Sequence, residues 1–407
     1  MAERVILHCD CNSFFASVES ALNPEYKNVP MAVCGSESDR HGIVLAKNEL
    51  ARKYGIKTAE TVYSAKKKCP LLVIAEPHYE EYTKYSQRVN EIYARYTDMI
   101  EPFGIDESWL DVTGSRKLFG TGEEIAEKIR REVREELGIT VSVGVSFNKI
   151  FAKLGSDYKK PDAVTVIDRS NFRDIAYPLP VSTLLFVGKK TETALLSMGI
   201  KTIGALAEAS AALLTMRFGK LGEMLHNYAN GNDDTPVLPV QDDAKSVSNG
   251  FTFRHDLVGR GECRIGIEYL SEEIGHRLRT HGMKCGTVVL TIKDEFLHSI
   301  QRQRPQNPPT DLSREISKTA YSILVDTWDE NKPIRMITVA ATNLTKGYAE
   351  QIDLFDDSSG KTREKNKNRE NAVDKIRQKY GNNSIITGAI LDTDIGVFTS
   401  KDNKKKS

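Results

Sequence analysis

Three carboxylates are the residues of this 407-residue chain whose types and spacing could do chemistry. Asp106 and Glu107 are adjacent, with Gly104 just ahead of them, and Asp10 ends an apolar run near the N-terminus. Carboxylates that are brought together repel each other, and the usual reason for such a group is a hard cation or a shared proton. An Asp-Glu pair in a turn is also common on a solvated surface, so this alternative stays open.

Strands and turns predicted around the three carboxylates would have to bring them together. Residues 4–10 read as a buried strand that runs into a helix over 13–21, with Asn12 or Ser13 as its cap. Residues 109–113 read as another strand, so the Asp106–Glu107 pair falls in or beside a tight turn. Because neighbouring side chains of an extended strand point to opposite faces, the backbone must bend near this pair.

The order of the remaining elements favours an antiparallel α+β sheet over a doubly wound one. Strands are expected over 30–35, 42–45, 100–105, 139–146 and 165–167, and helices over 48–54, 61–68, 79–96 and 123–136. No GxGxxG or GxxxxGK[ST] motif occurs, which argues against dinucleotide-binding and P-loop folds.

Three ordered segments resemble a known family. Asp10–Glu19 resembles the first motif of the Y-family DNA polymerases, the translesion enzymes of the bacterial polymerase IV type, and Gly104–Asp111 resembles their second metal motif. Ser142–Lys149, continuing to Pro161, resembles a third motif. The similarity extends from about residue 4 to about residue 345, in matching order and spacing.

The resemblance implies a multi-domain polymerase hand. Its antiparallel-sheet palm would comprise residues 1–22 and 78–168, and its small fingers residues 23–77. A helical thumb with a helix-hairpin-helix would cover 169–233, a linker 234–244 and an α/β little finger 245–346. The expected strands of the little finger are 246–253, 285–293, 297–304 and 334–342, and its helices 262–280 and 312–328. Residues 347–407 would form a C-terminal tail with a clamp-binding peptide and a basic helix.

The same resemblance implies the roles of the site residues. Asp10, Asp106 and Glu107 would be catalytic and would hold two Mg²⁺ ions together with the carbonyl of Cys11. The residues expected to contact the incoming dNTP are Phe14, Phe15, Arg52 and Lys160. Phe15 resembles the ring that excludes a 2′-hydroxyl; by pattern alone it would be a core residue.

One residue departs from the family pattern in this region. Glu49 occupies the position where many members have a triphosphate-binding Tyr, and a carboxylate cannot donate a hydrogen bond to phosphate oxygens. Lys47 or Asn48 could compensate. Nucleotide binding is therefore the step in which this chain is expected to differ.

Residues expected to bind DNA lie in two regions. The resemblance to a helix-hairpin-helix implies backbone contacts from Gly188, Lys189 and Lys190, although Phe186 replaces the usual first glycine of the hairpin and a plain helical connector remains an alternative. Sheet residues of the little finger are expected to follow phosphates in a salt-dependent way. These are Lys245, Arg254, Lys284, Arg302 and Arg304, of which the last two could instead protect an edge strand.

A short peptide after the last predicted domain resembles the clamp-docking motif of bacterial polymerases. In Gln351–Phe355, Gln351 would anchor the peptide while Leu354 and Phe355 fill an apolar pocket on a sliding clamp. Residues 361–379 hold eight Lys or Arg against three acids and read as a basic helix.

Composition fits a globular protein of several domains. Hydrophobic residues make up 40% and charged residues 28% of the chain, and the formal net charge is only +1. Any nucleic-acid contact must therefore come from local basic patches. Six cysteines without a CxxC pair, no signal-peptide pattern and no apolar run of about 18 residues predict a cytoplasmic protein without a membrane segment.

The resemblance therefore implies a monomeric, template-directed DNA polymerase of low fidelity without proofreading. Its partners would be primer-template DNA, dNTPs and a sliding clamp of the β type, and its role the bypass of DNA damage. Two alternatives stay open: a nucleotide cyclase or other two-metal phosphoryl-transfer enzyme, and a catalytically silent scaffold that binds a clamp or DNA. Asn12 argues against a phosphatase of the DxD type, which needs an acid at that position.

Overall fold

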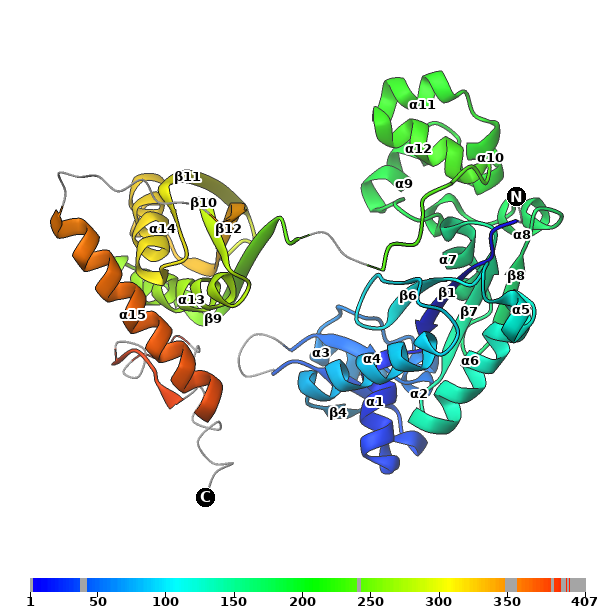
Figure 1. The fold of residues 1–407 in the computed structure, drawn as a ribbon, viewed down its shortest axis with the longest axis horizontal. Helices are drawn as coiled ribbons and strands as arrows, with labels where there is room; N and C mark the ends of the chain where they lie inside the picture. The colour runs from blue at the N-terminus through cyan, green and yellow to red at the C-terminus, as the bar shows by residue number, and fades with distance from the viewer. Residues whose placement is uncertain are drawn as a thin grey trace. The chain divides into compact units, whose positions relative to one another are not determined.

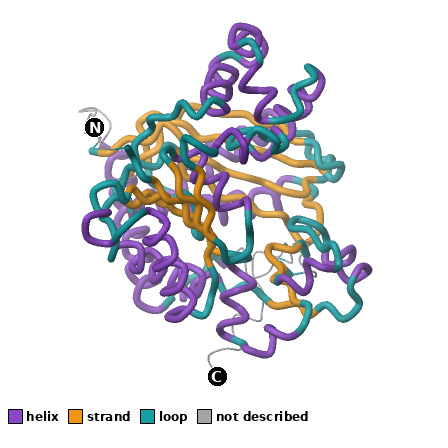
Figure 2. The backbone as a smooth tube through the Cα atoms, turned by 90° about the vertical axis from the view of Figure 1, so that its right-hand side faces the viewer, coloured by secondary structure: helices purple, strands orange, loops and turns teal. Residues whose placement is uncertain are grey.

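The computed structural model divides the chain into two compact units. The structure describes residues 3–36, 42–239, 243–347, 357–381, 384–388, 393 and 395. One unit comprises Met1–Gly35 and Gly42–Gln241, and the other is built mainly from Asp242–Ser407. Both units combine helices and strands (Figure 1), and Figure 2 distinguishes the helices, strands and loops of the chain by colour.

A five-stranded sheet is the centre of the first unit (Figure 1). Its strand order is β5-β6-β1-β7-β8. The strands are β1 (Ile6–Cys11), β5 (Ile100–Pro102), β6 (Glu107–Asp111), β7 (Val141–Ser146) and β8 (Val164–Ile167). The first four strands pair antiparallel, but β8 pairs parallel with β7, so the prediction of a purely antiparallel sheet is wrong at this edge. The reason is the connection: a helix lies between β7 and β8, and a helical crossover returns the chain in the same direction.

Helices cover both faces of this sheet. One face packs against α4 (Tyr79–Ala94) and α6 (Gly122–Leu137), where Leu7, Cys9 and Val143 are buried. The other face packs against α7 (Lys149–Tyr158). Gly144 makes this second contact close, because a Cβ there would lie 1.9 Å from the carbonyl oxygen of Ala152. The even-numbered residues of β1 therefore face α7.

A smaller sheet lies between residues 23 and 77. Its strand order is β3-β2-β4, and β2 pairs antiparallel with β3 and parallel with β4, a strand that the sequence pattern did not predict. Its elements and those leading to it are α1 (Phe14–Leu22), η1 (Pro24–Asn28), β2 (Met31–Cys34), β3 (Val44–Lys47), α2 (Glu49–Lys53), α3 (Val62–Lys68) and β4 (Val73–Ala75). Asn48 caps α2 by accepting a hydrogen bond from the Ala51 backbone N–H.

Short helices follow the large sheet and share one apolar core. They are α8 (Phe172–Ala176), η2 (Val181–Thr183), α9 (Lys189–Ser197), α10 (Ile203–Glu208), α11 (Ala211–Phe218) and α12 (Lys220–Ala229); a further short helix, α5 (Arg116–Phe119), precedes α6. Phe186, just before α9, has φ +69°, the left-handed conformation that favours glycine. The turn thus keeps the conformation of a glycine hairpin although the residue is Phe.

The segment expected to be a linker begins in contact with the first unit. Val237 is buried against Ile6 and Trp109, and the Leu238 backbone N–H donates to Glu101. Arg4 also donates to the carbonyl of Thr235. The buried Val237 therefore anchors the start of this segment on the sheet, while Thr235, Pro236 and Leu238 remain exposed.

The second unit is a four-stranded antiparallel sheet with order β11-β10-β12-β9. Its elements are β9 (Ser246–Leu257), α13 (Arg260–Thr280), β10 (Met283–Asp294), β11 (Ser299–Thr310), α14 (Ser313–Thr327), β12 (Ile334–Lys346) and α15 (Asp357–Tyr380). Residues of α13 and α14 share a core with one face of the sheet. Within the described residues, we find no helix with the length and apolar character that crossing a bilayer requires.

Candidate active site

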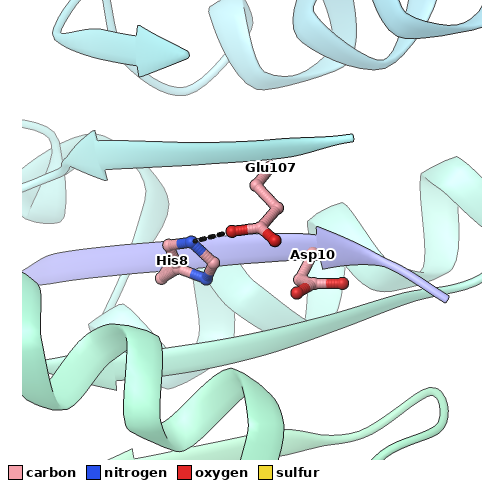
Figure 3. A group of neighbouring side chains, drawn as sticks. All are labelled: His8, Asp10 and Glu107. Atoms are coloured by element: carbon pink, nitrogen blue, oxygen red, sulfur yellow. Dashed lines mark ion pairs between the residues drawn. The ribbon is translucent and has the colours of Figure 1, made fainter. Parts of the chain in front are cut away.

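Asp10 and Glu107 are directly opposite each other on β1 and β6. Directly paired residues of antiparallel strands point to the same face, so both carboxylates lie on the α7 side of the sheet. Their oxygens and a ring nitrogen of His8 all lie within 4.8 Å of one another (Figure 3). Sequence positions almost a hundred apart thus meet because two strands share a register.

Asp106 precedes β6, in the bend formed by residues 104–106. It lines the same cavity of about 340 Å³ as Asp10 and Glu107. Burial raises the pKa of Asp106 to about 6, and the negative charges of Asp10 and Glu107 add to this shift. The bend therefore brings a third carboxylate close enough to interact with the other two.

Two lysines supply positive charge beside these carboxylates. Lys160 Nζ lies 2.6 Å from Asp10 Oδ2, and Lys153 Nζ lies 2.8 Å from Glu107 Oε2. Asp157 holds both ammonium groups, at 2.8 Å from Lys160 and 3.5 Å from Lys153. Burial disfavours the charged form of either lysine, but the surrounding carboxylates raise the pKa of both. Of these three residues, only Lys160 was predicted as a site residue.

His8 is a site residue that the sequence pattern missed. It is fully buried, its Nε2 lies 3.3 Å from Glu107 Oε2, and its Nδ1 lies 2.8 Å from Ser156 Oγ. Burial lowers the pKa of His8, so the ring is neutral near pH 7, and its Nε2 contacts Glu107. The signal was available in the sequence, because residues i and i+2 of a strand share a face and His8 precedes Asp10 by two.

Glu107 is the most strongly stabilised anion of the group. Burial opposes its charge, yet the contacts with His8 and Lys153 lower its pKa to about 2. Glu107 and Asp106 are thus neighbours in sequence with opposite pKa shifts. The cause is geometric: Glu107 has cationic and hydrogen-bonding neighbours on α7 and β1, whereas Asp106 mainly faces other acids.

Asn12 connects the end of β1 to the loop that carries Lys160. Its Oδ1 accepts hydrogen bonds from the Asp162 backbone N–H at 2.8 Å and from Thr140 Oγ1 at 3.0 Å. Its Nδ2 donates to Ser142 at 2.9 Å. Of the two predicted caps of α1, Asn12 and Ser13, it is Ser13 that occupies the N-cap position, and its side chain makes no capping hydrogen bond. Asn12 therefore fixes the loop next to the carboxylates and does not cap the helix.

Phe14 and Phe15 both line the cavity. Phe14 is buried in the core, whereas Phe15 is partly exposed and stacks on Tyr82 with ring centroids 4.2 Å apart and planes 11° from parallel. Tyr82 in turn donates a 2.6 Å hydrogen bond to the fully buried Glu19. Stacking on Tyr82 thus holds the Phe15 ring at the cavity wall.

The opposite part of the cavity carries Lys47, Glu49, Arg52 and Thr58. Glu49 Oε1 lies 3.2 Å from an Arg52 guanidinium nitrogen, and Arg52 also donates to Ser13 Oγ at 3.3 Å. Lys47 donates to Thr58 Oγ1 at 3.3 Å. Glu49 therefore already occupies one side of the guanidinium that was predicted to contact phosphate.

The donor set of the cavity fits a divalent cation. Asp10, Asp106 and Glu107 are hard oxygen ligands, which Mg²⁺ prefers, and Cys11 lines the same cavity. Burial raises the pKa of Asp106 and the charges of Asp10 and Glu107 add to the shift, and a cation among these acids would favour their charged forms. The Cys11 thiol is fully buried and burial raises its pKa, so it is not a thiolate ligand.

The residues predicted to bind DNA belong to other elements than those that line this cavity. Gly188 is the exposed cap residue of α9, and Lys189 and Lys190 begin that helix. Lys245 is exposed just before β9, and Arg254 and Lys284 are partly exposed on β9 and β10. The predicted clamp residues Gln351, Leu354 and Phe355 lie outside the described residues.

Arg302 and Arg304 lie on the edge strand β11, on the helix-covered side of the sheet. They are paired in register with the core residues Leu290 and Val288, so they point to that side. Arg304 lies 2.6 Å from Asp326 of α14 and also donates to Ser322. The partner of Arg304 in this structure is therefore a helix of its own unit.

Comparisons with known proteins agree with this geometry. Residues 9–157 match the model of the impB/mucB/samB family, residues 244–354 the C-terminal domain of that family, and residues 185–233 the thumb domain of DNA polymerase iota. The chain is 46% identical to DNA polymerase IV of Acetivibrio thermocellus, over 96% of this chain and 98% of that protein. It is 38% identical to DNA polymerase IV of Moorella thermoacetica, over 97% of each. Among solved structures, a Y-family DNA polymerase chimera matches with a TM-score of 0.74 and 26% identity, over 84% of this chain and 100% of that one.

Proposed function

Since the chain belongs to the impB/mucB/samB family of Y-family DNA polymerases, we propose that Asp10, Asp106 and Glu107 form the centre where it joins a dNTP to a primer. The enzyme is a DNA-directed DNA polymerase of the translesion type, and its fold is the α+β fold of that family. This membership decides against the cyclase alternative. The three clustered carboxylates argue against a silent scaffold, because grouping unused acids is costly.

The observation that carries the proposal is the register pairing of Asp10 with Glu107, with Asp106 in the adjoining bend. When bound, two Mg²⁺ ions would lower the pKa of the attacking 3′-hydroxyl and neutralise charge on the phosphate oxygens. Asp10, Asp106, Glu107 and the Cys11 carbonyl would hold them. Other residues of the chain would hold the ligands and the cation in place. His8 and Lys153 contact Glu107 and orient its carboxylate, and Asn12 fixes the loop that carries Lys160.

Residues around the carboxylates would bind and select the nucleotide. Lys160 and Arg52 are cations at the cavity wall that can attract the triphosphate, and both would have to exchange a carboxylate partner for phosphate. Phe15, held by Tyr82, would leave no room for a ribose 2′-hydroxyl, while Phe14 supports it from the core.

The proposal includes the division into domains that the resemblance implies. The palm would be residues 1–22 and 78–168, the fingers 23–77, the thumb 169–233, the linker 234–244, the little finger 245–346 and the tail 347–407. Gly188, Lys189 and Lys190 would contact the DNA backbone through the exposed start of α9, and Lys245, Arg254, Lys284, Arg302 and Arg304 would add cations from the second unit.

Further parts of the proposal concern partners and compartment. Gln351, Leu354 and Phe355 would dock on a sliding clamp, and the polymerase would work as a monomer in the cytoplasm, a reducing compartment consistent with six free cysteines. The proposal includes no proofreading step, so errors would persist.

Clamp docking is tested by the length of primer extension with a loaded clamp. The double variant Leu354→Ala/Phe355→Ala should abolish the gain in length that the clamp gives and leave extension without the clamp unchanged.

Primer extension with purified protein tests the central assignment. Wild type should extend a primer in Mg²⁺, and Asp10→Asn, Asp106→Asn and Glu107→Gln should each reduce incorporation by about 10³-fold or more while retaining primer-template binding. Asp111→Asn is a matched control, since this acid lies at the other end of β6. A fully active Asp106→Asn enzyme would remove that residue from the centre.

A further inference from the structure

The C-terminal helix α15 separates its charges between two faces. Its inward stripe is Arg363, Glu370, Asp374 and Arg377, at intervals of seven, four and three residues that place them on one side of a helix. Glu370 is buried and accepts hydrogen bonds from the backbone and hydroxyl of Ser313 at 3.0 and 2.9 Å. The two acids in this stripe are therefore directed into the second unit.

The partners of the stripe are polar groups of α13 and α14. Arg279 of α13 is bound by both Glu370 and Asp374, and Asp374 also lies 3.0 Å from His276. At the ends of the stripe, Arg363 pairs with Glu315 at 3.1 Å and Arg377 with Glu272 at 3.0 Å. The helix is thus fixed in orientation by ion pairs, which require an exact register.

The outer side of α15 is left with an excess of positive charge. Its exposed cations are Lys365, Lys367, Arg369, Lys375 and Lys379. Among the described side chains of 363–381, Glu364 is the only exposed acid. A face that is merely solvated usually mixes both signs, and the whole chain has a formal net charge of only +1. The positive charge is therefore concentrated on one side of this helix.

We propose that this face, defined by Lys365, Arg369, Lys375 and Lys379, is a further binding surface for the phosphate backbone of DNA. The four residues fall on the half of the helix that faces away from Glu370, since each lies within about 80° of the opposite direction at 100° per residue. From Lys365 to Lys379 the helix covers about 21 Å, roughly the length of six base pairs of duplex.

Charge complementarity indicates that the ligand of the basic face of α15 is a polyanion. The proposal rests on the DNA polymerase function above, which makes DNA the polyanion that the chain must hold. Exposed Lys and Arg side chains at the ends of flexible stems contact phosphates without reading sequence. Such contacts suit an enzyme that must follow DNA of any sequence, and they appear as a salt dependence of binding.

The test measures primer-template affinity by fluorescence anisotropy from 50 to 300 mM salt, with the full chain. The variant Lys365→Gln/Arg369→Gln/Lys375→Gln/Lys379→Gln should lower the slope of log K against log salt by about 2 to 4, since each lost phosphate contact removes about 0.9. Its affinity near physiological salt should fall about tenfold. An unchanged slope would overturn the proposal.

If the quadruple substitution disturbs folding, a single and a double variant on α15, with a double control variant on α5, still test the proposal. Glu364→Gln removes the one exposed acid of the face and should raise affinity about twofold. Lys375→Gln/Lys379→Gln should lower the slope by about 1 to 2, whereas Arg116→Gln/Lys117→Gln, which removes two exposed cations from α5 in the other unit, should not. Equal effects of the two double variants would contradict a local surface.

The result also separates this inference from the proposed function. If wild type extends primers and binds DNA but the slopes of all variants match, only the surface on α15 is refuted. If wild type neither binds primer-template nor extends it, the proposed function fails and this inference fails with it.

Discussion

Asp10 and Glu107 face each other across two antiparallel strands, and α7 brings Lys153 to the side on which both carboxylates lie. The register of two strands, and not nearness in sequence, therefore creates the charge cluster. His8, two residues before Asp10 on the same face, completes the group by contacting Glu107.

The free energy of unfolding should depend on pH in the way that the raised pKa of Asp106 requires. Its folded pKa, about 6, lies above the unfolded value of 3.8, so the stabilisation it gives is complete below about pH 4 and is lost as the pH rises through 6. In EDTA at pH 7, Asp106→Asn should therefore raise the free energy of unfolding, by about 1 kcal/mol after allowance for partial exposure. Urea unfolding at pH 5 and pH 7 measures this.

Glu107→Gln should change the free energy of unfolding in the opposite direction to Asp106→Asn. The pKa of Glu107 is lowered to about 2, below its usual 4.5, so its stabilisation is present above about pH 4.5 and is lost as the pH falls through 2. Glu107→Gln should therefore destabilise the protein at pH 7. Equal effects of the two substitutions would show that the neighbouring acids are not in the different environments described.

Replacing Phe15 should change sugar selection. Phe15→Ala removes the ring that closes the cavity wall, so the preference for dNTP over rNTP should fall by about 100-fold, while dNTP incorporation should fall much less. Tyr82→Leu removes the stacking partner of Phe15 and should weaken the preference less, by about tenfold. Single-nucleotide incorporation gives both ratios, and an unchanged ratio in Phe15→Ala would end its role as the gate.

Glu49 should weaken nucleotide binding in the wild-type enzyme. Its carboxylate repels a triphosphate and engages Arg52, so Glu49→Gln should lower KM for dNTP about three- to tenfold with little change in kcat. Glu25→Gln, an exposed acid of η1 outside the cavity, serves as control. A raised KM in Glu49→Gln would mean instead that Glu49 positions Arg52 for phosphate.

Glu370 should determine whether α15 stays on the second unit. Glu370→Gln leaves the Arg279 guanidinium, only 9% exposed, without one of its two carboxylate partners, at a cost of about 3 kcal/mol in docking. Hydrogen exchange should become faster in 363–380 and remain unchanged in α13. Glu364→Gln, on the outer face, should leave both exchange rates as they are.

The sequence allowed much of the site to be predicted because its signals are local. A polar residue at the end of an apolar strand marks Asp10, and the motif spacing marks Phe15. Asp157 was missed because only the packing of α7 against β1 brings its two lysine partners to the carboxylates. His8 was missed although its spacing of two residues from Asp10 on a strand was a local signal. The position of Glu107 inside β6, and not in the turn, depends on the same register.

The fold also has parts that local sequence signals predicted and parts that depend on packing between elements. Helix 61–68 was predicted almost to the residue, and the four little-finger strands were predicted in the right order, although β11 continues to Thr310, beyond its predicted end at 304. The parallel pairing of β8 and the inward direction of Arg304 were not predictable, since both depend on which element lies alongside. Phe186 takes a glycine-like φ because the surrounding helices impose the turn.

Single-turnover nucleotide incorporation by Asp106→Asn, with primer-template binding measured in parallel, tests the central claim most directly. We expect the rate to fall by about 10³-fold or more while DNA affinity stays within about threefold of wild type. A rate within about tenfold of wild type, with DNA bound normally, would show that the carboxylates gathered around Asp10 are not the centre of the reaction.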